Sequence, residues 1–119
     1  MAKALLFNFS GEKKKKLSFL LMQYGITAIE GAAGDANRPI GAILGKDGRF
    51  PLPNMDPPFF EEMLVLDDLD PRQFHGLLNG MQMIQASVPY KAVTTDNNLS
   101  WTPSRLCREL VAEHEALKK

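Results

Sequence analysis

Short apolar runs separated by helical stretches predict four strands. Residues 4–9 and 63–66 are apolar on both alternating faces, which is typical of strands covered on both sides of a sheet. Residues 26–30 are shorter and less apolar, so they suit an edge strand. Residues 90–94 form a fourth strand, which ends in a polar loop. We therefore expect the first and third strands at the centre of the sheet.

Three helices are predicted between and after these strands. Ser10 begins a helix that runs to about residue 24. Asp70 begins the second, with proline at the first helical position and glutamine two residues later, which together indicate a capping box. Thr102, again followed by proline, begins the third. Apolar side chains recur at helical spacing in each, so each helix is expected to bury one side.

The predicted order of elements is β-α-β, a long connection, and β-α-β-α. The connection, at about residues 31–60, is rich in proline and glycine, and only residues 40–44 suit a helical turn or two. A connection this long fits a crossover between parallel strands better than a hairpin. We predict an α/β domain with a four-stranded, mainly parallel sheet in the order 2-1-3-4 and three main helices on both faces. The alternative is a ferredoxin-like α+β fold with an extra C-terminal helix, in which the order is 4-1-3-2.

Composition and charge fit a single domain over residues 1–119. The chain has 14 basic and 14 acidic residues and a net charge of zero, so it lacks the broad basic surface of nucleic-acid-binding proteins. No apolar run approaches the roughly 20 residues that span a bilayer, and the N-terminus does not resemble a signal peptide. We therefore expect a cytoplasmic protein that associates with neither membranes nor nucleic acid. No internal repeat is evident.

Few residues suggest catalysis or metal binding. Cys107 is the single cysteine, so neither an internal disulfide nor a cysteine metal cluster is expected. His75 and His114 are far apart, and no acids stand at ligand spacing around either. The sequence thus predicts no catalytic residues, no metal site and no cofactor.

Four consecutive lysines, Lys13 to Lys16, lie in the first predicted helix. They cover all sides of it, so some of their stems must lie along apolar surface while the charges reach water. The preferred interpretation is a solvated face. Contact with an acidic partner or with nucleic acid is the alternative.

Residues 91–94, Asn97 and residues 100–102 together resemble the C-terminal signature of a small bacterial family, domain of unknown function 3783. The resemblance extends back to residues 62–65 and, more thinly, to residues 39–41 and the first strand. This family is functionally uncharacterised. The resemblance therefore implies a compact bacterial cytoplasmic domain and transfers no catalytic residue.

Polar side chains follow the first, third and fourth strands. In a parallel sheet, ligands bind beyond the carboxyl ends of the strands where the strand order reverses, which here lies between the first and third strands. Two aspartates at this edge favour a cation, a hydroxyl or an amine over a bare anion. Helix caps and strand ends explain most of these residues without a ligand. The predicted ligand-binding residues are Asn8, Ser10, Asp67, Asp68, Thr94, Thr95 and Asn97.

No motif indicates a biochemical activity. The leading hypothesis is a non-enzymatic binding or regulatory module that engages a protein partner or a small ligand. A homodimer is a further option if Phe59, Phe60 and the two preceding prolines are exposed. The alternatives are a small-molecule or nucleotide binder at the strand edge, and an enzyme that uses Asp67 or Asp68 as a general base.

Overall fold

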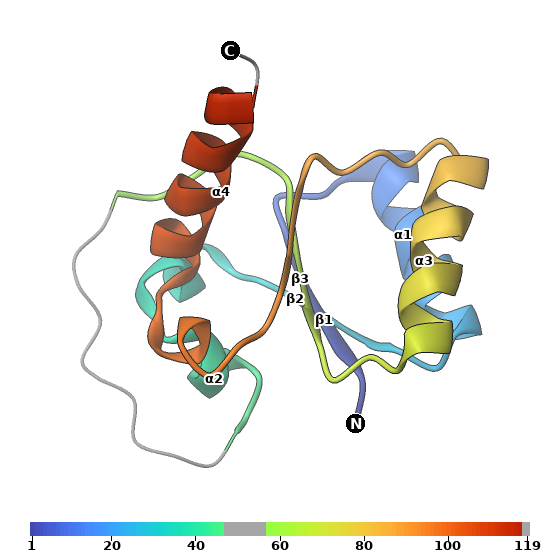
Figure 1. The fold of residues 1–119 in the computed structure, drawn as a ribbon, viewed down its shortest axis with the longest axis horizontal. Coiled ribbons are helices and arrows are strands. Elements are labelled where there is room, and N and C mark those ends of the chain that lie inside the picture. The colour runs from blue at the N-terminus through green and yellow to red at the C-terminus, as the bar shows by residue number, and fades with distance from the viewer. Residues whose placement is uncertain (47–56, 118–119) are drawn as a thin grey trace.

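The computed structural model describes residues 1–46 and 57–117 and contains one four-stranded sheet between two layers of helices (Figure 1). The predicted α/β class and the predicted strand order, β2-β1-β3-β4, are confirmed. The strands are β1 (Lys3–Phe7), β2 (Thr27–Glu30), β3 (Met63–Asp67) and β4 (Tyr90–Val93).

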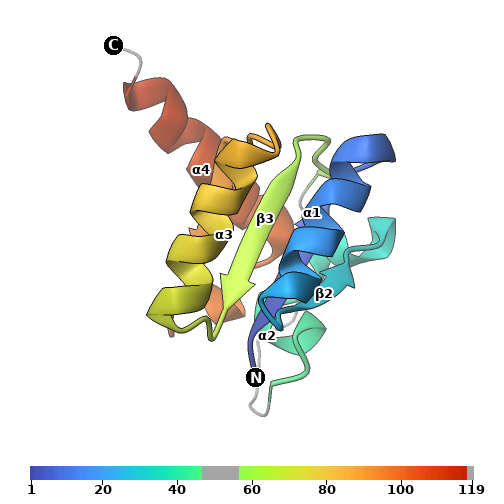
Figure 2. The same ribbon diagram turned by 90° about the vertical axis from the view of Figure 1, so that its right-hand side faces the viewer.

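Helices cover both faces of the sheet, as predicted. The helices α1 and α3 lie side by side on one face, and α2 and α4 lie on the other (Figures 1 and 2). Their bounds are α1 (Gly11–Gln23), α2 (Ile40–Ile43), α3 (Pro71–Met83) and α4 (Pro103–Leu117), with short 3₁₀ helices at Ala33–Asn37 and Asn98–Ser100.

Two of the three strand pairings are parallel, β1 with β2 and β3 with β4. The central pair is antiparallel, with Lys3 opposite Asp67 and Leu5 opposite Val65. The expectation that β1 and β3 point the same way is therefore wrong. It rested on the length of the connection before β3, and a long connection can return the chain to either end of a sheet. The alternative strand order 4-1-3-2 is not observed.

The chain contains two βαβ units of matching dimensions. The first unit is β1, α1 and β2, and the second is β3, α3 and β4. Strand β3 begins 60 positions after β1, helix α3 begins 60 positions after α1, and the paired elements have equal lengths. Because β1 and β3 are antiparallel and meet at the Leu5–Val65 pair, the units are related by an approximate two-fold axis.

This structural repeat is hidden in the sequence because the side chains diverge. Within the paired strand and helix, only Leu6 and Leu66, and Leu17 and Leu77, are identical. The backbone pattern is nevertheless closely repeated. The amide of Ile26 donates to the Leu21 carbonyl at 2.9 Å, and 60 positions later Ala86 donates to Met81 at 2.9 Å.

The apolar strands supply both halves of the core. In β1, Leu6 faces the α1 and α3 layer, whereas Leu5 faces the α2 and α4 layer. Strand β3 alternates in the same way, with Leu64 on the first side and Val65 on the second. The prediction of two doubly covered central strands is thus confirmed.

Glycines in α3 set the approach of α1. A Cβ atom on Gly76 would lie 2.4 Å from the Tyr24 ring, and one on Gly80 would lie 2.7 Å from a Leu20 methyl group. The loss of helix propensity at both glycines, about 1 kcal/mol each, is therefore offset by close packing between the two helices.

Candidate functional site

The carboxyl ends of β3 and β4 meet at one edge of the sheet because the two strands are parallel. Leu66 pairs with Val93 at the end of the ladder, and the amide of Thr94 donates to the Leu66 carbonyl at 2.9 Å. The side chains of Asp67 and Thr94 are thereby brought together. Both residues were predicted to belong to this edge.

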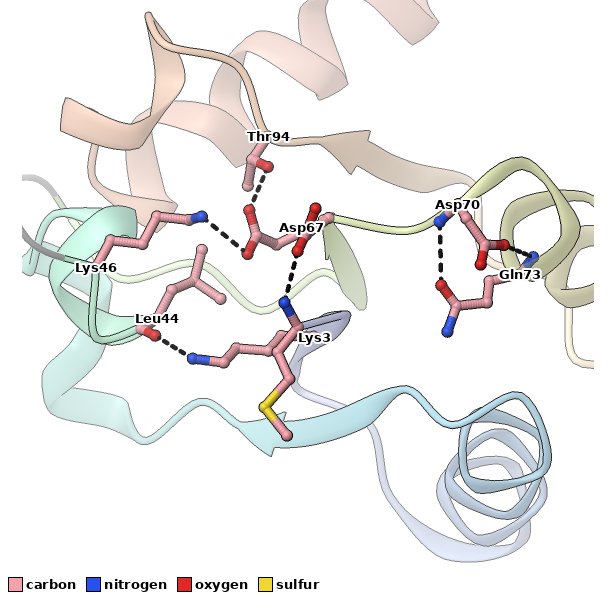
Figure 3. Close-up of polar contacts among 9 residues, drawn as sticks. Lys3, Leu44, Lys46, Asp67, Asp70, Gln73 and Thr94 are labelled. Atoms are coloured by element: carbon pink, nitrogen blue, oxygen red, sulfur yellow. Dashed lines mark hydrogen bonds and ion pairs between the residues drawn. The ribbon is translucent and has the colours of Figure 1, made fainter.

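Asp67 is the buried charge of the edge, with 4% of its surface exposed. Its carboxylate accepts a hydrogen bond from Thr94 Oγ1 at 2.7 Å and forms an ion pair with Lys46 Nζ at 3.2 Å (Figure 3). A buried carboxylate is stable only when it is paired and hydrogen-bonded. These two contacts therefore join β3 to β4 and to the segment that follows α2.

A second lysine strengthens this connection. Lys3, which stands opposite Asp67 in the sheet, donates through Nζ to the Leu44 carbonyl at 2.7 Å (Figure 3). Leu44 caps the C-terminal end of α2, and a cation is favourable at the carbonyl end of a helix. The end of α2 is thus held against the edge of the sheet by Lys3 and Lys46.

Asp68 follows Asp67 and is exposed. Its backbone has a φ of 61°, a left-handed conformation that Asp tolerates better than most residues. The Met1 ammonium group lies 2.6 Å from Asp68 Oδ2. This hydrogen bond, the charge of the same ammonium and, more weakly, Lys46 hold the pKa of Asp68 below its ordinary value of 3.8.

A hollow of about 360 Å³ opens beside these groups. Asp67 lies within its wall, and exposed carboxylates stand at its rim. The residues that line it are Lys46, Leu66, Asp67, Asp68, Leu69, Phe74, Val93, Thr94, Thr95, Asp96 and Leu99.

Asn98 shapes the loop at the far side of the hollow. Its side chain donates to the Val93 carbonyl at 3.1 Å and accepts from the Thr95 amide at 2.8 Å. Asn98 is buried, whereas the predicted Asn97 is exposed and does not line the hollow. The sequence predicted a polar turn here and Asn97 as its ligand-binding residue, whereas the side chain that holds the turn in the structure is that of Asn98.

Asn8 and Ser10 lie at the opposite end of the sheet, so the predicted crevice that combined them with the aspartates does not form. The antiparallel pairing of β1 and β3 is the physical reason. Asn8 Nδ2 donates to the carbonyls of Phe59 and Glu61 at 3.2 and 2.9 Å, and Ser10 precedes α1 without a side-chain capping bond. Both residues remain outside the candidate site.

Lys46 and Asp96 belong to the edge but were not predicted from the sequence. Lys46 follows α2 in the long connection, some 20 positions before Asp67, and no local pattern relates the two. In the sequence, Asp96 belongs to the polar loop that ends the fourth predicted strand. Its position two residues after Thr94 was the signal that could have placed it at the edge.

Other reactive groups of the described chain do not build a second chemical site. Burial raises the pKa of the Cys107 thiol to about 11, with a smaller contribution from the negative charge of Glu61. Such a thiol is a poor nucleophile at neutral pH. No group of three or more candidate metal ligands occurs within residues 1–46 and 57–117.

Exposure is uneven in the segment that precedes β3. Phe60 is 83% exposed, and Pro57 and Pro58 are exposed as well. Phe59 instead packs edge-on against Phe7, with ring centroids 5.5 Å apart. The predicted apolar patch is thus accessible at three of its four positions, and the homodimer stays a prediction.

No helix in the described ranges is long and apolar enough to cross a membrane.

Comparison with known proteins relates the second half of the chain to a family. Residues 62–117 match the model of a family described as "Domain of unknown function (DUF3783)", which confirms the resemblance of the second half of the chain to that family. The matched segment contains β3, α3, β4 and α4, and therefore most of the residues that line the hollow. No curated protein and no solved structure matches the chain.

Proposed function

We propose that the chain is a non-enzymatic binding module that holds a small ligand in the hollow at the carboxyl ends of β3 and β4. The observation that carries this proposal is the buried Asp67 in the wall of the hollow, beside Thr94 and Lys46. The carboxyl ends of parallel strands are also where α/β proteins commonly bind ligands.

The charges at the hollow indicate the class of ligand. Asp68 and Asp96 line the opening, and both are exposed. Asp68 also accepts from the Met1 ammonium group, and the one lysine of the lining is engaged with Asp67. Carboxylates accept hydrogen bonds and attract cations, whereas they repel phosphates and other anions. A ligand with an amine or several hydroxyl groups fits this surface better than a nucleotide.

The same contacts favour binding over catalysis. Asp67 is occupied by a hydroxyl donor and an ammonium group, so its carboxylate is not free to take a proton from a substrate. The lowered pKa of Asp68 makes that carboxylate a weaker base than an ordinary aspartate. Neither aspartate therefore supports the general-base alternative.

A thermal-shift screen of amines, amino acids, polyols, sugars and nucleotides tests the proposal. We expect amine or polyol compounds to raise the unfolding midpoint of the full chain, and nucleotides to leave it unchanged. The double variant Asp68→Asn/Asp96→Asn should reduce the affinity for such a compound by about tenfold or more, because each charged hydrogen bond contributes roughly 1.5–3 kcal/mol. Titration calorimetry gives the affinities.

Glu109→Gln serves as the matched control, since Glu109 is an exposed carboxylate on α4 outside the hollow. It should leave the affinity unchanged. The proposal fails if no compound in the screen stabilises the chain. It also fails if the control weakens binding as much as the double variant does.

A further inference from the structure

The outer face of α1 carries apolar side chains that the core does not use. Phe19 and Met22 are 57% and 67% exposed, and Lys15 precedes Phe19 by one helical turn on the same side. Together they border a shallow groove of about 590 Å³. The groove is lined by Gly11, Lys14, Lys15, Ser18, Phe19 and Met22.

The repeat within the molecule shows that the fold does not require these side chains. Helix α3 has the same length and the corresponding place in the second βαβ unit, yet it has polar residues at the three matching positions, all exposed. The counterparts of Lys15, Phe19 and Met22 are His75, Asn79 and Gln82.

The lysines of α1 divide into two pairs. Lys13 and Lys14 form ion pairs with Glu62 and Glu30, each at 2.6 Å, and so attach the helix to neighbouring segments of its own chain. Lys15 has only a loose pair with the exposed Glu12 at 3.8 Å. Lys16 is exposed, and the described part of the chain offers it no ion-pair partner. The groove therefore has a loosely paired positive charge, Lys15, beside exposed apolar surface, and the exposed Lys16 follows Lys15 on the helix without lining the groove.

We propose that this face of α1 docks an acidic segment of a partner protein. Its carboxylates meet Lys15 and Lys16, and one or two large apolar side chains lie against Phe19 and Met22. The helix is about 20 Å long, which suits a short peptide segment. A membrane surface or nucleic acid would call for a broader basic surface, and half of the lysine run is already neutralised within the chain. This docking surface is separate from the ligand hollow and does not depend on it.

Selection from a library of random displayed peptides tests the docking surface even though the partner is unidentified. The full chain is the target, and the variant Lys15→His/Phe19→Asn/Met22→Gln is used to remove peptides that bind elsewhere. These substitutions install the residues of α3, so the variant should keep its fold and its unfolding midpoint. We expect the retained peptides to be acidic, to contain large apolar residues, and to lose affinity by about tenfold or more in the variant.

Met83→Gln is the matched control, because it removes another exposed methionine, on α3, and should leave peptide binding intact. The proposal is overturned if no peptide distinguishes the wild-type chain from the triple variant, or if the retained peptides show no acidic bias. Binding of phosphatidylserine vesicles or duplex DNA through Phe19 and Met22, without binding of acidic peptides, would also overturn it.

Discussion

The carboxyl ends of β1 and β3 have the same backbone geometry, but the first is filled by apolar side chains and the second by a buried carboxylate. Asn8 and Asp68 are 60 positions apart, and both have left-handed φ angles, 67° and 61°. Asn8 donates to the Glu61 carbonyl at 2.9 Å, and Asp68 accepts from the amino group of Met1, the counterpart of Glu61, at 2.6 Å. The two-fold relation of the units thus extends to the contacts of their turns.

The side chains just before these turns differ completely. At the end of β1, Phe7 packs against Phe59, and a Cβ atom on Gly31 would lie 2.2 Å from the Phe7 ring. At the end of β3, Asp67 stands at the position that corresponds to Phe7, and Thr94 at the position that corresponds to Gly31. The Thr94 hydroxyl donates a hydrogen bond to the Asp67 carboxylate. Because Phe7 and Phe59 fill the end of β1 with apolar side chains, the fold does not require a buried carboxylate at the corresponding end of β3. This difference directs attention to the Asp67 end as the site.

The largest effect is expected from the core position at which the two helices carry the same residue. Leu17 and Leu77 are both fully buried, and replacing either with alanine should lower the free energy of unfolding by about 2–5 kcal/mol. Urea denaturation measures both values. If one variant loses less than half as much stability as the other, the two units are not equivalent in packing.

Helix capping should give a smaller and unequal effect. Asp70 accepts from the Gln73 amide at 2.7 Å, and the Gln73 side chain accepts in return from the Asp70 amide. Asp70→Ala should therefore lower the free energy of unfolding by about 1 kcal/mol. Ser10 makes no such bond, and Ser10→Ala should remain within about 0.5 kcal/mol of wild type. Equal losses in the two denaturation curves would contradict this contrast.

The smallest effect concerns pH and Asp68. Its pKa is lower in the folded chain than the ordinary value of 3.8, so its ionised form stabilises the fold above that value, and this contribution is lost as the pH falls through the folded pKa. Asn8, its counterpart, does not titrate. Asp68→Asn should flatten the dependence of the unfolding midpoint on pH below about 4. It should lower the midpoint slightly above pH 5, where the ionised Asp68 contributes fully, and leave it nearly unchanged at the acid end of the profile. An unaltered acid profile would show that the Met1 contact contributes nothing.

Local patterns in the sequence were sufficient for the secondary structure and the strand order. The doubly apolar strands placed β1 and β3 in the centre, and the Asp70 and Thr102 caps located the starts of α3 and α4. The Thr102 hydroxyl accepts from the Arg105 amide at 3.2 Å, as its position before a proline predicted.

Those local patterns did not predict which distant segments of the chain lie side by side. The direction of β3 depends on the path of about 30 connecting residues, whose prolines and glycines suit many paths. That direction decided whether Asn8 would lie at the same edge of the sheet as Asp67. The pairing of β3 with β4 did not depend on it, which is why the Asp67, Thr94 and Thr95 part of the predicted site stayed together. Lys46 could not be anticipated, because only tertiary structure brings it to Asp67.

Because β1 and β3 are apolar on both faces, the pattern of their side chains does not by itself fix the register in which they pair. Where one face of a strand is polar, a shift by one residue turns polar groups into the core, and this penalty fixes the alignment. Strands that are apolar on both faces lack that penalty. The register of the two strands must then be fixed at their ends. At one end Asn8 binds the segment before β3, and at the other end Lys46 forms an ion pair with Asp67. These polar contacts at the two ends therefore hold β1 and β3 in a single register.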